Sequence, residues 1–327
     1  MKAANCRAIG EQEGRIDFCR WLTVTFVSKR FLYTAMATYN CLAPLVFERT
    51  KQLDSVYLPL SEIGKNDKIV FDLSSIKFIK PPALIGLLVL IESLIQKASN
   101  QRPNILITAP KDKHVLDYLL KINFVGTLQS MGGWKITGKM PTKISRKIRP
   151  VIPITRFKTA NDIENIATKM SEIFQTDLIG LSTLLQPCHV IFSELADNVI
   201  HHAGSGGGYI LAQQYSYRNG PMIDIAVGDA GIGIPSSLRN NPNLAGLFTD
   251  DKSAIILALR DQVTRFDDPY RGFGLGHIKA ELGSITKRSL TIRSGTGYAI
   301  VKGSGYTFTG VNKWLPGTIA HAVIPCR

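Results

Sequence analysis

The sequence has few cysteines and places none of them in pairs. Its five cysteines are too widely separated for a CxxC motif or for the ligand spacing of a zinc site. We therefore expect no structural zinc, and free thiols in a reducing cytoplasm are the simplest interpretation. The cysteines are Cys6, Cys19, Cys41, Cys188 and Cys326.

The chain also lacks a clear bilayer-spanning run. Residues 31–47 carry no charge, but they are short for a span and are interrupted by Thr38, Asn40 and Pro44. Acidic residues near the start of the chain break up the apolar region that a signal peptide needs. We therefore expect a cytoplasmic protein without a membrane partner, with a peripheral membrane contact of residues 31–47 as the alternative.

Acidic residues are scarce compared with basic ones. Lys and Arg number 39 against 25 Asp and Glu, which gives a formal net charge of +14. A basic surface favours nucleic acid, nucleotides or acidic proteins, although an evenly solvated surface is the simplest interpretation. Residues 129–161 contain no acidic residue, which predicts a linker with a basic face. Its basic residues do not alternate with aromatic ones, so we expect no base-stacking platform.

Low-complexity tracts and repeats are absent too, and the composition, with 45% hydrophobic and 20% charged residues, is near the globular average. At 327 residues the chain is long enough for two domains. Residues 21–27 favour a strand and residues 31–45 a helix. The expected divisions are an N-terminal extension of unclear structure (1–55), a first domain (56–130), a basic linker (131–158) and a second domain (159–327).

The first domain alternates strand and helix patterns. Short apolar runs at 68–73 and 103–108 predict strands, and leucines at helical spacing predict a helix over 82–97. A second helix is expected at 114–120. Strand and helix in alternation indicate a partly parallel sheet.

Part of this domain resembles a STAS domain, the fold of anti-sigma-factor antagonists. The resemblance covers Asp-Leu-Ser-Ser-Ile-Lys-Phe-Ile at 72–79, the helix after it, and a strand that ends at Ala109-Pro110. In the antagonists a phosphorylatable Ser or Thr follows the Phe-Ile pair. Here positions 80–83 are Lys-Pro-Pro-Ala, so the resemblance implies a structural role rather than a phosphorylation switch, although Ser74 and Ser75 lie nearby.

The second domain shows helix patterns first and strand patterns later, with further helices between the strands. This order predicts an α/β sandwich, a mixed sheet with helices on one face. We expect helices at 161–174, 187–202, 253–264 and 276–282, and strands at 209–215, 222–228, 290–293, 298–301 and 318–324.

Polar residues repeat every four positions in the helix expected at 187–202. Glu194, Asn198 and His202 share one stripe of that helix. A polar stripe is also ordinary for a surface helix, so this motif is weak alone.

A second motif begins where the strand at 222–228 ends. Asp229 is followed by Gly231 and Gly233 in an Asp-x-Gly-x-Gly pattern. A carboxylate at a strand end can accept a hydrogen bond from an exocyclic amine such as adenine N6, and glycines let the backbone turn tightly and approach a ligand. The alternative is a plain turn.

A third motif, Arg-Gly-Phe-Gly-Leu-Gly-His at 271–277, leads into a helix. Glycines before a helix expose N–H groups where the dipole favours an anion, which suits a triphosphate, and Arg271 adds a cation. A flexible loop with a helix cap is the alternative. Thr318 begins the last predicted strand and can hydrogen-bond a base or a water held by Asp229.

These four motifs, in this order, resemble the GHKL ATPases. That family includes gyrase-type topoisomerases, heat-shock chaperones, histidine kinases and MutL-type repair proteins, and anti-sigma-factor serine kinases share its fold. The resemblance spans most of residues 160–327. A Walker P-loop, GxxxxGK[ST], is absent.

The resemblance implies ATP and Mg²⁺ as ligands. Glu194 matches the general base that activates a water or a substrate hydroxyl, Asn198 the Mg²⁺ ligand, and Asp229 the carboxylate that reads adenine. Thr318 would support the base. The residues expected to contact the nucleotide through glycine turns and the phosphate-facing lid hinge are Gly231, Gly233, Arg271, Gly272, Gly274, Leu275 and Gly276.

Residues 235–270 correspond to an ATP lid, in which Lys252, Arg260 or Arg265 could meet the γ-phosphate. His201 and His202 lack the separate acceptor helix of histidine kinases, so we expect them to pack within the fold or to support neighbouring site residues.

Three functions remain open from the sequence. The first is an ATP- and Mg²⁺-binding regulatory protein with slow hydrolysis, whose ordered lid controls the interaction with another protein. The second is a protein-serine kinase of the anti-sigma type. The third is a nucleic-acid-associated ATPase that uses its basic segment. The oligomeric state is left open, with a dimer among the options.

Overall fold

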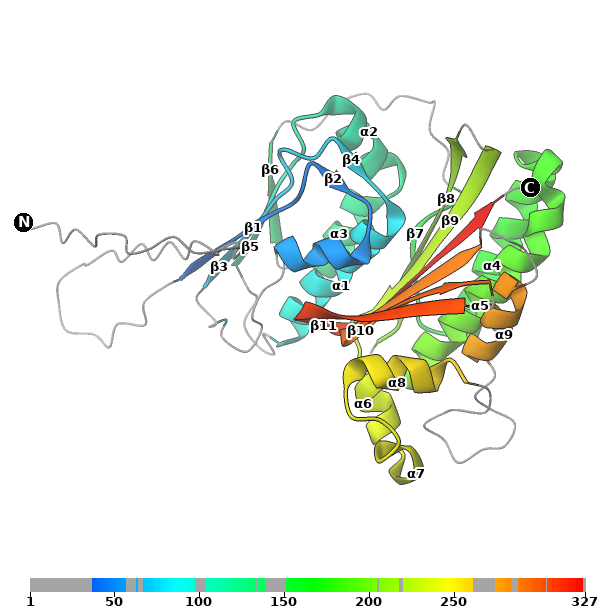
Figure 1. Cartoon of the computed structure of the whole chain (residues 1–327). Helices are drawn as coiled ribbons and strands as arrows, with labels where there is room; N and C mark the ends of the chain where they lie inside the picture. Colours follow the sequence, from blue (N-terminus) through cyan, green and yellow to red (C-terminus); the bar gives the residue numbers. More distant parts are fainter. Residues whose placement is uncertain are drawn as a thin grey trace, which may run out of the picture.

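The chain forms two large β-sheets, with helices between and around them (Figure 1). The fold class is α/β, as predicted. Among the described strands, the four-stranded sheet contains only parallel pairs and the five-stranded sheet only antiparallel pairs, so the two kinds are separated rather than mixed in one sheet. The computed structural model describes residues 37–56, 63, 67–97, 104–132, 134–138, 151–204, 206–217, 220–260, 274–283, 288–303 and 305–325.

The four-stranded sheet has the order β1-β3-β5-β6 and lies in the first half of the chain. The apolar runs predicted as strands form β3 and β5, and the leucine pattern forms the helix α1. The elements are β1 (Thr38–Leu42), β2 (Val46–Phe47), the 3₁₀ helix η1 (Thr50–Val56), β3 (Lys68–Asp72), β4 (Phe78–Ile79), α1 (Pro81–Lys97), β5 (Asn104–Thr108), α2 (Lys113–Lys121), α3 (Phe124–Met131) and β6 (Trp134–Thr137).

One predicted helix is wrong over its described part. Residues 38–42, inside the helix expected at 31–45, form β1 and pair in parallel with β3. Pairing with a neighbouring strand overrides local helix preference in such a short segment. The strand expected at 21–27 lies outside the described residues.

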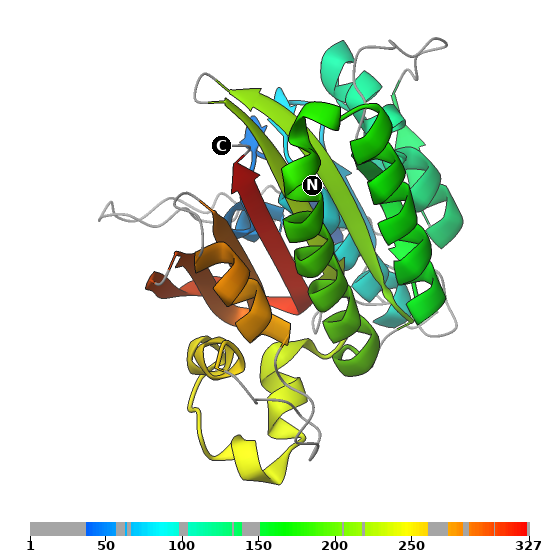
Figure 2. The same ribbon diagram turned by 90° about the vertical axis from the view of Figure 1, so that its right-hand side faces the viewer.

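The five-stranded sheet has the order β10-β11-β9-β8-β7. Helices α4, α5 and α9 cover one of its faces (Figure 2). The elements are β7 (Ile152–Phe157), α4 (Ala160–Thr176), the 3₁₀ helix η2 (Ile179–Leu184), α5 (Leu185–His202), β8 (Gly208–Tyr217), β9 (Gly220–Asp229), α6 (Gly233–Arg239), α7 (Pro242–Ala245), α8 (Asp251–Ala258), α9 (Gly274–Gly283), β10 (Ser289–Lys302) and β11 (Gly305–Pro325).

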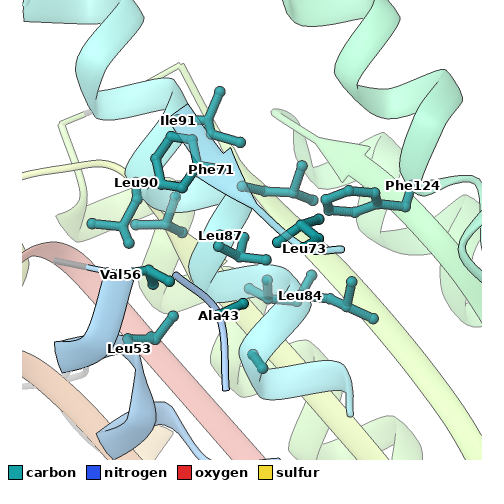
Figure 3. Packing of buried hydrophobic residues seen from close by; sticks show 14 of the residues in the cluster. Ala43, Leu53, Val56, Phe71, Leu73, Leu84, Leu87, Leu90, Ile91 and Phe124 are labelled. Atoms are coloured by element: carbon teal, nitrogen blue, oxygen red, sulfur yellow. The ribbon is translucent and has the colours of Figure 1, made fainter. Parts of the chain in front are cut away.

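Helix α1 lies between the two large sheets. Every residue from Pro81 to Leu94 is buried, as expected of a helix that is apolar on all sides. Leu84, Leu87 and Ile91 pack with side chains of η1 and β3 (Figure 3), and the same core cluster includes residues of β8, β9 and β11. The two halves of the chain therefore share one hydrophobic core.

Side chains are packed very closely where α1 meets the five-stranded sheet. A Cβ placed on Gly228 of β9 would lie 2.6 Å from Cγ2 of Ile85. Arg293 of β10 is fully buried and donates to the carbonyl of Thr50 and to the carboxylate of Asp54 in η1. These contacts cover the face of the sheet opposite to α4, α5 and α9.

The sheets extend into both the predicted N-terminal extension and the predicted linker. Strand β1 lies within residues 1–55, and strands β6 and β7 lie within the predicted linker at 131–158. Residues 139–150, which carry most of the predicted basic face, lie outside the described residues. Among the helices that are described, none is long and apolar enough to cross a membrane.

Candidate functional site

The end of β9 carries a buried carboxyl group. Asp229 is only 4% exposed, and its Oδ1 accepts a hydrogen bond of 2.8 Å from the N–H of Gly231. Burial raises the pKa of this carboxyl to about 7, although hydrogen bonds from the N–H groups of Gly231 and Thr318 favour its charged form. The nearby carboxylate of Glu92 also raises it.

Three polar side chains form a row across neighbouring strands at this point. In the sheet register Thr318 of β11 is opposite both Asp229 of β9 and Ser294 of β10. The hydroxyls of Thr318 and Ser294 lie 3.0 Å apart. Ser294 also donates to the carbonyl of Gly317 and accepts from the N–H of Ile234, each at 2.9 Å. The structure therefore brings together Asp229 and Thr318, two residues selected from distant motifs, and adds Ser294, which the sequence analysis missed.

The glycines of this site make room for other parts of the protein. A Cβ on Gly231 would lie 2.1 Å from the carbonyl oxygen of Ala203 at the end of α5. Gly233 and Gly317 both have positive φ angles, of 77° and 66°, and a Cβ on either would collide with neighbouring chain. Packing within the protein is enough to explain Gly231 and Gly233, and their contact with a nucleotide stays a prediction.

Helix α5 carries Glu194 and Asn198 on one stripe, as the spacing predicted. The amide nitrogen of Asn198 donates to the backbone carbonyl of Glu194 at 2.7 Å. Further along, the carbonyl of Ala203 accepts from the N–H of Ile232 at 2.9 Å. The C-terminal end of α5 therefore contacts the turn that follows Asp229. The side chain of His202 is not among those described.

Helix α9 begins with the glycine-rich motif and lies along α5 (Figure 2). Its first turn contains Gly274, Leu275 and Gly276, and Leu275 is partly buried against the core. His277 follows, with Nδ1 2.8 Å from Oε1 of Glu194. This contact links the third motif to the first. Arg271 and Gly272 lie outside the described residues.

The described part of the predicted lid is folded and packed. Residues 235–260 contain α6, α7 and α8, which enclose a small apolar core that includes Leu238 and Phe248. Asp251 in α8 accepts from the N–H of Thr296 in β10 at 2.9 Å and fixes this group of helices to the sheet. Arg260, a candidate for the γ-phosphate, is exposed at its end, whereas Arg265 lies outside the described residues.

No preformed metal centre is present within the described part of the chain, where no three His, Cys, Asp or Glu side chains are close enough to share an ion. Cys41 and Cys188 are buried free thiols, as expected, and burial raises the pKa of Cys41 to about 12. His189 contacts the hydroxyl of Ser171 at 3.1 Å, which is consistent with a packing role.

Comparison with known proteins does not assign the chain to a family. No protein-family model matches the chain, and no curated protein sequence matches it significantly.

Proposed function

We propose that this chain is a GHKL-type protein that binds ATP with Mg²⁺, hydrolyses it slowly, and uses the occupied state to control its interaction with another protein. The observation that carries the proposal is the row of Asp229, Thr318 and Ser294 beside the end of α5, in which Asp229 and Ser294 are buried. Four sequence motifs separated by as many as 120 residues would thereby contribute to one nucleotide site.

The row of side chains has the chemistry that an adenine base requires. An ionised Asp229 accepts hydrogen bonds only, so it would pair with the exocyclic amine N6. Thr318 can donate or accept and would bind a ring nitrogen or a bridging water. A carboxyl with a pKa of about 7 is half ionised near neutral pH, and a bound amine would favour the charged form.

The phosphates would lie toward α5 and the start of α9. The first turn of α9 presents N–H groups to an anion, and its dipole favours negative charge there. Asn198 would hold Mg²⁺ through its amide oxygen, with phosphate oxygens and waters completing the shell. Mg²⁺ would neutralise charge on the phosphates, while Glu194 takes the proton of the attacking group.

The regulatory part of the proposal rests on α1. This helix packs directly behind β9, the strand that ends in Asp229, and belongs to the part of the chain that resembles a STAS domain. A change at the nucleotide end of β9 would therefore act on a surface shared with the first half of the chain. The partner would be another protein, and the proposed setting is the cytoplasm.

A second candidate function, transfer of phosphate to a protein serine, is favoured by the position of Glu194. Its side chain is 27% exposed, so a hydroxyl on another protein could reach it from outside the chain. Labelled ATP separates the two functions, because transfer labels the partner protein whereas hydrolysis releases free phosphate.

The proposal is tested by calorimetric titration with ATP in the presence and absence of Mg²⁺. We expect wild-type binding to strengthen with Mg²⁺, and Asn198→Ala to remove that gain, a loss of at least about tenfold in affinity. Asn161→Ala, at an exposed asparagine in the first turn of α4, is the matched control and should bind as the wild type does. Wild-type protein that does not bind ATP would contradict the proposal.

A further inference from the structure

His277 and Glu194 join the outer edges of α9 and α5. Nδ1 of His277 lies 2.8 Å from Oε1 of Glu194, and the two side chains are 60% and 27% exposed. An exposed pair of this kind contributes little to stability, because water screens both groups and two side chains must be held still. Stability alone therefore does not account for the contact.

The backbone around His277 is held firmly although its side chain is exposed. The next residue, Ile278, is fully buried, and so is Leu282 one turn later, which fixes α9 against the core. On α5 the neighbouring Leu195 is buried in the same way. The imidazole and the carboxylate therefore project from two helices that are packed into the same hydrophobic core.

We propose that His277 is a positioning residue for Glu194, holding one carboxylate oxygen so that the other faces the attacking hydroxyl. This inference rests on the proposed function, in which Glu194 is the general base. It adds a role for a residue that belongs to the glycine-rich motif but is not one of its glycines.

The hydrogen bond between His277 and Glu194 gives the two carboxylate oxygens of Glu194 different roles. An ionised carboxylate can only accept, so His277 must donate from Nδ1, in its neutral or its protonated form. Oε1 is then occupied and Oε2 is the atom that takes the proton. In hydrolysis, the water oxygen forms a bond to the γ-phosphorus as its proton moves to Oε2. The bond from phosphorus to the bridging oxygen breaks, ADP leaves with the electron pair, and Glu194 later releases the proton to solvent.

Two substitutions of similar polarity separate positioning from general packing. In His277→Asn the amide nitrogen can stand where Nδ1 stands, whereas in His277→Gln it reaches the place of Nε2 and misses Glu194. In the full chain we expect His277→Gln to lower kcat for ATP hydrolysis about tenfold with KM for ATP unchanged. His277→Asn should keep kcat within about threefold of the wild type, because the donor is retained.

Two further variants complete the test. His114→Ala, at an exposed histidine in the first turn of α2, should leave both constants unchanged. Glu194→Gln combined with His277→Gln should be no slower than Glu194→Gln alone, because a positioning residue has no effect once its base is gone.

The outcomes distinguish this inference from the function on which it depends. Wild-type protein that does not bind ATP in the calorimeter overturns both. Binding without turnover, equal kcat for the Asn and Gln variants, or an effect on KM alone overturns the positioning role and leaves ATP binding standing.

Discussion

The charge of Asp229 depends strongly on its surroundings. Burial keeps its pKa near 7, about three units above that of a free aspartate, so the folded protein retains a proton that the unfolded chain has lost. Between pH 4 and 7 the folded state therefore binds more protons than the unfolded state. Its contribution to stability is greatest below pH 4 and falls as the pH rises through 7.

The fall in stability with rising pH leads to a prediction for Asp229→Asn. This substitution removes the titrating carboxyl group and keeps the shape of the side chain. Relative to the variant, the wild-type protein should lose roughly 1–3 kcal/mol of unfolding free energy between pH 5 and pH 8. Urea unfolding of both proteins at the two pH values measures the difference. Parallel pH dependence in the two proteins would show that Asp229 is ionised throughout.

At the residue scale, the sequence motifs identified site residues that lie at the start or end of a strand. They missed residues that reach the site only through the pairing of strands or the packing of helices. Asp229 and Thr318 were identified because each has a glycine close to it in the sequence. Ser294 and His277 were not given roles, because their contacts depend on the register of β10 against β11 and on the packing of α9 against α5. Local sequence does not encode either.

At the scale of elements, the contact between α1 and β7 holds a partly buried ion pair. Glu92 of α1 is 7% exposed and pairs with Arg156 of β7, whose guanidinium also lies 5.5 Å from the ring centre of Tyr209. Burial raises the pKa of Glu92, whereas the positive charge of Arg156 lowers it. The pair thus offsets part of the cost of burying a carboxylate between the two halves of the chain.

Removing the cation should therefore destabilise the fold, and more at high pH. We expect Arg156→Ala to cost about 1–3 kcal/mol at pH 8 and less at pH 5, where Glu92 can take up a proton. Glu92→Gln in the same protein should recover part of the loss. Arg239→Ala breaks a more exposed pair with Asp251 and should cost under about 1 kcal/mol. Equal losses for the two arginine variants would contradict a special role for burial.

Elements with a strong period or a compact apolar run were predictable, and several short strands were not. The leucine pattern of α1 and the stripe of α4 gave helices within one or two residues of those observed. Strands β1, β6 and β7 have six residues or fewer and lie within segments with no clear alternation. Each of them forms because it pairs with a neighbouring strand. That pairing depends on the tertiary fold and not on the local sequence.

At the scale of the whole molecule, part of the core of the second half lies against the first half. Tyr209, Leu211 and Ile319 of the five-stranded sheet are buried in the cluster around α1 rather than the one under α5. The sequence predicted helices on one face of this sheet, and it could not reveal that a helix from the other domain covers the opposite face.

A fragment of residues 151–327 should therefore fail to form a stable, well-packed fold. Without α1, it would expose a contiguous apolar face, and we expect aggregation or strong binding of a hydrophobic dye, with no sharp thermal transition. The full chain, measured alongside, should unfold in a single cooperative step. A monomeric fragment with a sharp transition would mean that the two halves are independent.

The burial of α1 on both sides has a consequence for biosynthesis. A ribosome finishes α1 at Lys97 and reaches β11 only at Gly305, an interval of roughly 10–40 s at typical bacterial elongation rates. Until β8, β9 and β11 have all been made, one side of this largely apolar helix lacks part of the surface that covers it in the folded protein. We therefore expect nascent chains of this protein to bind chaperones that shield apolar segments during translation.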